Sequence, residues 1–440
     1  MDLAPEKNNE KRDKQKDPIF FREARLEDCA QVARLQERLG IEPDSSDDWQ
    51  RIWRDNPFAS PEHCVGWVLE TTRPPIQIVG FLGNVPLGYS FGEKPIRAVA
   101  ARGWVVEPEH RTHAMKQVLK YMSQRNVDLI INSSSNDVAF KIFNGLGSKI
   151  LPQKIFGNIL YWVGSPRSFL KSVFLKFRLP EFVAEIGAVL LAVFWQPILF
   201  LKLRTLKVRA NVLAQSFELT TLAPESVNSE NGPEVDSNTG SNTGSKIGSK
   251  IESKVKANSR AAFDLFWSQK KQEKVRLFAD RSANALAWHM KRRPVENNIV
   301  DGAQAKPGLG PRGRIIVCRR KGDPKFEILG YLASIQKQGS KLGFVREQIV
   351  DLIALNDRPE VLEALLLEAY RLAQKEGVGA LELMALPATV RSVAIGLKPF
   401  FRKAFPTPFT YKIVNPSAFN GEHQMAEDWY VSLYDGDSSL

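Results

Sequence analysis

The chain has 440 residues, 43% of them hydrophobic, and this length favours two domains of ordinary size over one. Its three cysteines lie far apart without a CxxC pair, which argues against a disulfide framework or a thiolate metal site, so we expect no bound metal and a reducing cytoplasm. The formal net charge of +12 predicts an acidic partner: a phosphate-bearing ligand, an anionic lipid surface or a nucleic acid.

The N-terminal part of the chain predicts a tail followed by an α+β domain. Residues 1–17 are charged throughout and lack an apolar core, so we expect a disordered tail and no secretory signal. Residues 18–164 predict a strand, a helix and three more strands, with short apolar runs and hairpin-like turns. A helix, a buried strand, a helix that begins after Asn136 and a last strand, ILYWVG, complete this domain.

Residues 165–222 are expected to form an apolar, basic helical segment. Residues 165–210 contain eight basic and two acidic residues, which gives a net charge of +6. Residues 182–203 approach the length of a membrane span, but Glu185 and Pro197 make them an imperfect one. Three interpretations stay open: packing between the domains, contact with an anionic membrane surface, or a true span. The following residues 223–259, rich in Ser, Gly, Asn and Lys, predict a flexible linker.

Residues 260–440 repeat the order of elements and predict a second α+β domain. The junction after its strand IVDLIAL reads NDRPEVLEALL, without glycine and with two glutamates that would repel phosphate. Trp288 and His289 lie on a helix and are expected to be a core aromatic residue and a partly buried histidine.

Acidic residues near the end of the chain allow two interpretations. Asp351 could accept a hydrogen bond from a substrate amine, although an aspartate on a half-buried strand is more often structural. The segment WYVSLYDGD brings Trp429, Asp435 and Asp437 together, as a capping strand and turn or as an edge that contacts substrate.

The stretch VVEPEHRTHAMKQVLKY, residues 105–121, predicts an anion site. A strand leads through a loop into a helix, so we expect unpaired amides around His113, Ala114 and Met115, reinforced by the helix dipole. The stretch resembles the signature V-x-P-x-x-R-x-x-G-x-G/A of the GNAT superfamily of acyl-CoA N-acyltransferases, which lies between the fourth strand and the third helix. Val106 and Arg111 match it, with Pro108 in register.

A second match follows downstream. The family often shows N-x-x-A-x-x-x-Y-x-x-x-G-F, and Asn136, Ala139 and Gly147 occupy the corresponding positions. Together the motifs imply two tandem GNAT-like folds, the second one degenerate. The resemblance further implies that acyl-CoA, such as acetyl-CoA, binds the first copy, with the backbone of the fourth strand at Val106 holding pantetheine and the following loop holding the phosphates. The implied binding residues are Val105, Val106, Arg111, Thr112, His113, Ala114, Met115, Lys116 and Asn136.

The sequence also departs from the family pattern. Ala114 and Lys116 stand at the two glycine positions, where a close approach of the backbone to phosphate is partly lost. Phe143 replaces the tyrosine that often serves the family as general acid, and it cannot protonate a leaving thiolate. The candidates for the base that takes the ammonium proton are Glu107, Glu109, His110 and His113.

These observations favour an N-acyltransferase, similar to N-acetyltransferases, in which an amine directly attacks an acyl-CoA thioester. The alternative is a catalytically degenerate GNAT-fold protein that serves as a binding or scaffold module. Nucleic acid ranks last as a partner, because the basic excess lies beside leucines and phenylalanines rather than on a polar face. The expected location is the cytoplasm, with peripheral contact at the inner membrane face as an alternative.

Overall fold

The computed structural model describes most of the chain outside its N-terminal segment and several internal segments. The described residues are 18–61, 63–151, 158–228, 259–291, 313–325, 327–338, 345–403, 408–419 and 428–437, with the backbone alone for 196–203. The predicted tail 1–17 and most of the predicted linker 223–259 lie outside this part. The chain divides into two compact units, and unit 1 comprises Met1–Gln50, Pro61–Asn84 and Ala101–Ser123. Unit 2 comprises Arg51–Ser60, Val85–Ala100 and Gln124–Leu440.

Unit 1 contains the first strands of an antiparallel sheet. Strand β1 (Ile19–Glu23) pairs with β2 (Gly66–Thr71), and β2 pairs with the beginning of β3 (Ile78–Phe91). The remaining elements of this unit and its borders are η1 (Leu26–Asp28), α1 (Cys29–Arg38), α2 (Ser46–Trp49), η2 (Gln50–Arg54), the end of β4 (Lys94–Val106), η3 (Pro108–His113) and α3 (Ala114–Met122).

Helices cover both faces of this part of the sheet. The Trp67 ring on β2 contacts Tyr121 of α3 edge to face at 6.3 Å between centroids, and Gln117 of α3 donates to the Trp67 carbonyl at 3.0 Å. Trp49 of α2 contacts Phe81 of β3, which is the cross-strand partner of Val68, the residue after Trp67. Since successive side chains of a strand point to opposite faces, α3 and α2 lie on opposite faces.

Unit 2 contains the later strands of the first sheet. Strand β5 (Leu129–Asn132) runs parallel to β4 and pairs on its other side with β15 (Thr410–Ile413), which also pairs with β6 (Lys149–Ile150). Helix α4 (Asp137–Gly145) follows β5. The end of β3 pairs with β9 (Leu277–Ala279), and β9 pairs with β16 (Trp429–Tyr430).

The second sheet lies wholly in unit 2. Its strand order is β14-β7-β13-β12-β11-β10-β8, in which β12 and β13 are parallel and the other pairs are antiparallel. The strands are β7 (Asn158–Val163), β8 (Phe217–Leu222), β10 (Gly313–Arg320), β11 (Ile328–Gln338), β12 (Val345–Ala354), β13 (Ala380–Leu383) and β14 (Phe400–Lys403).

The two sheets repeat one strand order. The first reads β1-β2-β3-β4-β5-β15-β6 and the second, from its other edge, β8-β10-β11-β12-β13-β7-β14. In each, four strands in chain order precede a fifth that is parallel to the fourth, and the strand after the fifth comes from the other half of the sequence. Strands β7 and β15 are thus exchanged between the halves, an arrangement that supports a duplicated fold.

Three details differ from the expectations from sequence. The strand ILYWVG, placed with residues 18–164, pairs as β7 in the second sheet. The end of the predicted helical segment 165–222 is β8, which pairs with β10 along six residues before the predicted linker. The stretch TVRSVAIGLKPFFRK predicts a helix that continues to Lys403, but α12 (Ala388–Gly396) ends earlier, because the residue before Pro399 disfavours helical backbone, and β14 follows.

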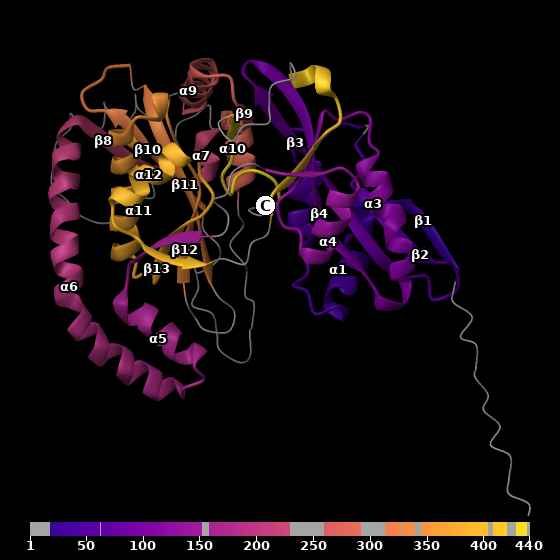
Figure 1. The fold of residues 1–440 in the computed structure, drawn as a ribbon, viewed down its shortest axis with the longest axis horizontal. Helices are drawn as coiled ribbons and strands as arrows, with labels where there is room; N and C mark the ends of the chain where they lie inside the picture. The colour runs from indigo at the N-terminus through magenta and orange to yellow at the C-terminus, as the bar shows by residue number, and fades with distance from the viewer. Residues whose placement is uncertain are drawn as a thin grey trace, which may run out of the picture. The chain divides into compact units, whose positions relative to one another are not determined.

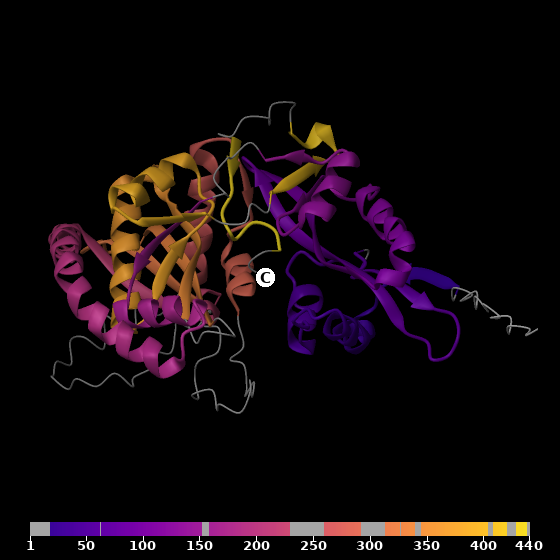
Figure 2. The ribbon, with the colours of Figure 1, turned by 60° about the horizontal axis from the view of Figure 1, so that its bottom comes forward.

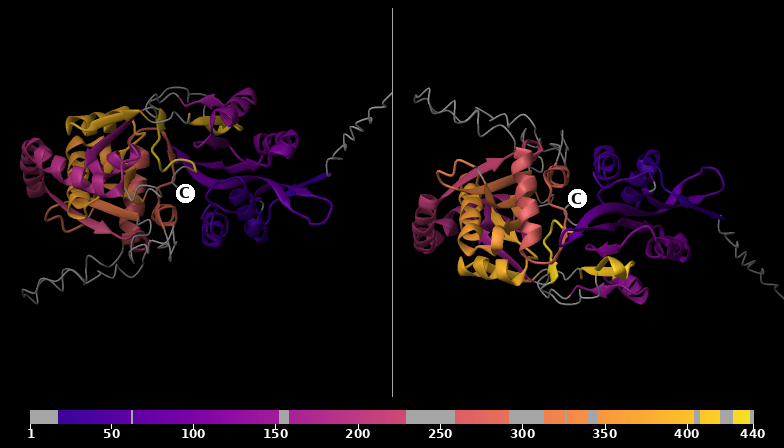
Figure 3. Two further views of the ribbon diagram at one scale, coloured as in Figure 1. Left: turned by 90° about the horizontal axis from the view of Figure 1, so that it is seen from below. Right: turned by 90° about the horizontal axis from the view of Figure 1, so that it is seen from above.

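Helices also cover both faces of the second sheet (Figures 1 and 3). Tyr331 of β11 contacts Phe263 and Phe266 of α9 (Ser259–Glu273). A Cβ added to the preceding Gly330 would meet Val361 of α11 (Pro359–Lys375) at 2.9 Å, so α11 packs closely against the opposite face. The other helical elements here are α5 (Pro166–Lys176), α6 (Glu181–Ser216), α7 (Pro224–Val227), α10 (Ala283–Met290), η4 (Leu355–Asp357) and η5 (Pro416–Phe419).

The central segment forms a helical hairpin of α5 and α6, in which Leu170 of α5 packs against Ala188 and Ala192 of α6. Among the described residues, no helix is both long and apolar enough to cross a lipid bilayer.

Candidate functional site

The predicted anion site lies, as the resemblance requires, between the fourth strand and the third α-helix. Strand β4 ends at Val106, η3 follows, and α3 begins at Ala114. The binding positions differ in exposure: Val105 is buried, and Val106, His113 and Ala114 are half-buried. Four positions of the junction are exposed: Arg111, Thr112, Met115 and Lys116. The exposed face of the turn therefore carries two cations, and no carboxylate among the described residues forms an ion pair with either of them.

More backbone amides of this turn form internal hydrogen bonds than the sequence suggests. Residues 108–113 form a 3₁₀ helix, in which amides bond to carbonyls three residues back. The His110 amide donates to the Glu107 carbonyl at 3.0 Å, and the Ala114 amide donates to the Arg111 carbonyl. The expectation of an unpaired amide at Ala114 is therefore wrong, because local turn bonds have used it. The exposed side chains of Arg111 and Lys116 are the cationic groups that this turn presents to solvent.

The structure brings the candidate bases Glu107, His110 and His113 into one short turn. The Glu107 carboxylate accepts from Arg38 at 2.8 Å, and Arg38 also donates to the Ile78 carbonyl at 3.0 Å. Through Arg38, this contact links the Glu107 carboxylate to the backbone of β3 and gives it a structural role. His110 and His113, on the same turn, are half-buried.

The second motif forms the local structure that its residues predict. The Asn136 side chain accepts from the Ala139 amide at 2.9 Å, which makes it the N-cap of α4. Phe143, at the family's tyrosine position, is 2% exposed and packs in the core. Gly147 ends this region with a φ of +90°.

In the second copy, the chain itself occupies the strand position that the resemblance assigns to pantetheine. The parallel ladder between β12 and β13 ends at Ile349 and Leu383, but β12 continues to Ala354. Beyond the ladder, the Val350 carbonyl accepts from the Tyr434 amide at 3.0 Å. The Leu352 carbonyl accepts from the Tyr430 hydroxyl at 2.5 Å. The C-terminal segment, residues 428–437, thus bonds the backbone of β12 beyond the point where the parallel ladder ends.

The junction after β12 is also filled by side chains of the protein. Buried Lys270 donates to Asp357 at 2.8 Å, to Glu273 at 2.7 Å and to the Ala354 carbonyl at 2.7 Å. Arg276 pairs with Asp357 at 2.9 Å, and the Asn356 amide donates to Glu273. Lys270 and Arg276 hold the pKa of Asp357 below its usual range against the opposing effect of burial. The junction after this strand therefore holds carboxylates of the protein that are paired with Lys270 and Arg276.

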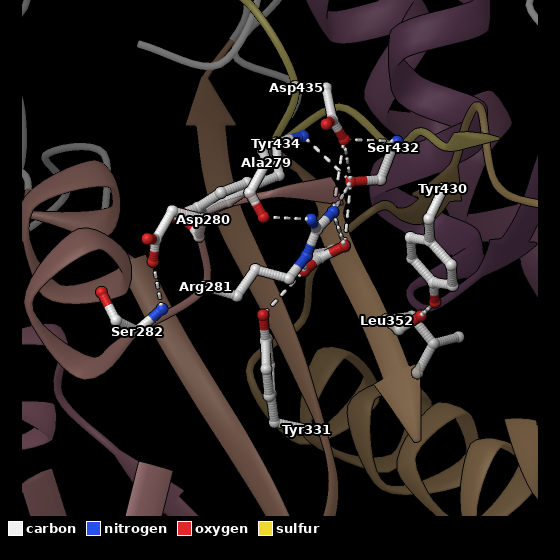
Figure 4. Close-up of polar contacts among 11 residues, drawn as sticks. Ala279, Asp280, Arg281, Ser282, Tyr331, Leu352, Tyr430, Ser432, Tyr434 and Asp435 are labelled. Atoms are coloured by element: carbon white, nitrogen blue, oxygen red, sulfur yellow. Dashed lines mark hydrogen bonds and ion pairs between the residues drawn. The ribbon is translucent and has the colours of Figure 1, made fainter. Parts of the chain in front are cut away.

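A buried cluster of polar side chains fixes the C-terminal segment to the second sheet (Figure 4). Arg281, which is 0% exposed, donates to Asp351 at 2.7 and 3.2 Å, to Asp435 at 3.3 Å and to the Ala279 carbonyl at 2.8 Å. Ser432 donates to Asp351 at 2.8 Å, and the Ser432 amide donates to Asp435 at 2.8 Å.

Aromatic rings and a second hydroxyl complete this cluster. The Tyr331 hydroxyl donates to Asp351 at 2.7 Å, and the Arg281 guanidinium lies about 5 Å from the ring centroids of Tyr430 and Tyr434. Burial raises the pKa of Asp435, and Arg281 is the largest opposing influence. Because the side chains of the Arg281–Asp351 pair are both 0% exposed, the cluster is a structural clamp with no access for substrate.

The structure therefore decides between the two interpretations of the acidic residues. Asp351 and Asp435 are structural acceptors inside the clamp. Asp437 accepts from the hydroxyls of Ser133 and Ser134 at 2.6 Å each, just after β5. Trp429 packs against Tyr411, with 4.6 Å between ring centroids.

Sequence reasoning missed Arg281, Tyr331 and Ser432, which complete the clamp, because no local pattern links residues so far apart. The core interpretation of Trp288 is confirmed, and His289 is more buried than expected, at 1% exposure, stacked on Tyr434. Among the described residues, no group of three or more His, Cys, Asp and Glu side chains could hold a metal ion.

No family model matches this sequence, and no curated protein sequence matches it significantly. Solved structures with a similar fold include a GCN5-related N-acetyltransferase from Anabaena variabilis, at 10% identity and a TM-score of 0.48, over 91% of this chain and 74% of that one. A probable N-acyltransferase from Enterococcus faecalis has 8% identity and a TM-score of 0.48, with 91% and 74% covered. N-myristoyltransferase from Saccharomyces cerevisiae, solved with bound myristoyl-CoA, has 10% identity and a TM-score of 0.44, with 91% and 79% covered.

We assign the fold from features of this chain itself. The two sheets share one strand order, and the signature residues Val106 and Arg111 lie between the fourth strand and the third α-helix. These features agree with the GNAT-like fold that the sequence resemblance implies, and the shared strand order suggests two copies of one fold.

Proposed function

We propose that this protein is an acyl-CoA-dependent N-acyltransferase in which only the first copy binds acyl-CoA. The observation that carries the proposal is the turn after β4, where the signature residues Val106 and Arg111 stand in register. Two exposed cations, Arg111 and Lys116, lie on this turn, and neither forms an ion pair with a described carboxylate. Guanidinium and ammonium groups are the side chains best suited to hold pyrophosphate where glycine amides are lacking. The second copy supports restricting acyl-CoA binding to the first copy, because side chains and backbone of the protein fill the positions at and after its fourth strand.

The reaction would be direct transfer. The neutral amine attacks the thioester carbonyl carbon, the C–S bond breaks, and the CoA thiolate leaves with a proton from solvent or from a neighbouring acid. A base must first take the proton of the ammonium group. We assign this role to His110 or His113, because an imidazole nitrogen can accept a proton and the Glu107 carboxylate is engaged by Arg38.

The alternative is a GNAT-fold scaffold without catalysis. It is favoured by the 3₁₀ turn, which uses the Ala114 amide, and by the burial of Phe143 at the position of the family's general acid. The two functions differ in whether the full chain binds acyl-CoA at all.

Isothermal titration of the full chain with acetyl-CoA and with a longer acyl-CoA tests this proposal. We expect binding that Arg111→Ala and Lys116→Ala each weaken about tenfold, the effect of losing one charge-assisted bond of about 1.4 kcal/mol. The matched control is Arg34→Ala, which removes an exposed arginine from α1 and should leave binding unchanged. No binding of either thioester by the folded wild type would refute the proposal and favour the scaffold.

The catalytic assignment needs its own measurement. Release of free CoA thiol in the presence of a pool of amines should fall in His110→Ala or His113→Ala while acyl-CoA binding persists. If both variants release thiol at the wild-type rate, neither histidine is the base.

A further inference from the structure

Helix α6 has one face packed against the protein and one face exposed. Ala184, Ala188 and Ala192 recur every four residues on the inner face and are at most 8% exposed. Ala188 and Ala192 pack with Leu170 of α5, and Phe174 of α5 and Trp195 of α6 pack against this cluster. This packing fixes which side of α6 points outward.

The outer face of α6 is apolar over three helical turns. Phe182, Ile186, Val189 and Val193 lie on one helical stripe, and Val183, Leu190 and Phe194 lie on the neighbouring one. Their exposed fractions range from 37% for Val183 to 76% for Phe194. In Figures 1, 2 and 3, α6 lies along the outer margin of unit 2, with no other described helix or strand outside it. Such a continuous exposed apolar surface is unusual unless it contacts a partner.

Basic side chains flank this face at both ends. Lys176 and Arg178 at the end of α5 are exposed, and so are Arg204 and Lys207 farther along α6. No carboxylate among the described residues forms an ion pair with these four cations. The local carboxylates are already neutralised, because Glu185 pairs with Arg167 and with Lys171 at 2.9 Å, and Glu181 pairs with Lys171 at 3.0 Å.

We propose that the α5–α6 hairpin docks on an anionic lipid bilayer, with the outer face of α6 at the level of the headgroups and upper acyl chains. The apolar side chains of α6 are then removed from water, and the four flanking cations bind lipid phosphates. A second copy of this chain is a poorer occupant, because it would bring like charges together at the rim. This surface is independent of the proposed acyl transfer and does not require it.

Flotation of the full chain with lipid vesicles tests the proposal. The protein should float with vesicles of phosphatidylcholine mixed with phosphatidylserine, and much less with pure phosphatidylcholine or at high salt. Ile186→Asp with Val193→Asp should abolish flotation with an unchanged melting temperature, because both side chains are exposed. Lys207→Glu should lower the partition coefficient by about fivefold or more. The control Val138→Asp changes an exposed valine on α4 and should float like wild type.

Two results would overturn this inference. In the first, the wild type stays at the bottom of the gradient with anionic vesicles, or the Ile186→Asp, Val193→Asp double variant floats as well as the wild type. In the second, sedimentation shows a lipid-independent dimer that the same double variant dissociates, which would assign the face to self-association.

Discussion

We expect a large, pH-dependent loss of stability when the guanidinium of Arg281 is removed from the clamp. Arg281→Met leaves the carboxylates of Asp351 and Asp435 without their cation at sites that are 0% exposed. Breaking a buried ion pair from one side costs about 3–5 kcal/mol, because the remaining charge stays desolvated. We expect that loss of unfolding free energy near pH 8.

The pH dependence follows from Asp435. Burial already raises its pKa above the ordinary value of 3.8, and Arg281 opposes this rise, so the variant should raise the pKa further. A carboxyl group with a raised folded pKa contributes stability that is complete below its unfolded pKa and is lost as pH rises through the folded pKa. The cost of Arg281→Met should therefore be smaller at pH 5 than at pH 8.

Urea unfolding followed by tryptophan fluorescence at both pH values measures this effect. Hydrogen exchange of residues 428–437 tests whether the C-terminal segment is released. Arg371→Met is the matched control, since its exposed pair with Glu368 on α11 should contribute less than about 0.5 kcal/mol. Equal costs for the two variants, or a cost for Arg281→Met that does not change with pH, would refute this account of the clamp.

Two further predictions concern other buried contacts. Gly436→Ala should destabilise the C-terminal segment by about 1 kcal/mol or more, because Gly436 has a φ of +84° and a Cβ would meet the Ser133 hydroxyl at 2.4 Å; unchanged hydrogen exchange of residues 428–437 would contradict this. Burial raises the pKa of Cys318 to about 12, so at pH 8 only about one thiol in ten thousand is ionised. Cys318 should react with a disulfide reagent only after denaturation, whereas the half-buried Cys29 should react in the folded protein; mass spectrometry of labelled peptides distinguishes the two.

Much of the local structure and the place of the candidate site could be predicted from the sequence alone. Alternating and helical apolar periods located most strands and helices, because those periods reflect which face of each element is buried. Asn136 was predicted as a helix cap, and its oxygen does accept the Ala139 amide. The turn after β4 was located by Val106 and Arg111, because a strand, a loop and a helix start are all defined within a few residues.

Features that depend on distant residues were decided only by the tertiary structure. Strands β7 and β15 have ordinary strand sequences, but nothing local selects the sheet that each one joins. The closed turn at Ala114 depends on whether the chain forms a 3₁₀ or an α-helical bond, a small difference that the residue types do not settle. The Arg281–Asp351 pair joins residues 70 positions apart, and its burial follows from how the sheet and the C-terminal segment pack together. Periodicity reports which face of an element is buried, whereas the partner of that face is chosen by the packing of the whole domain.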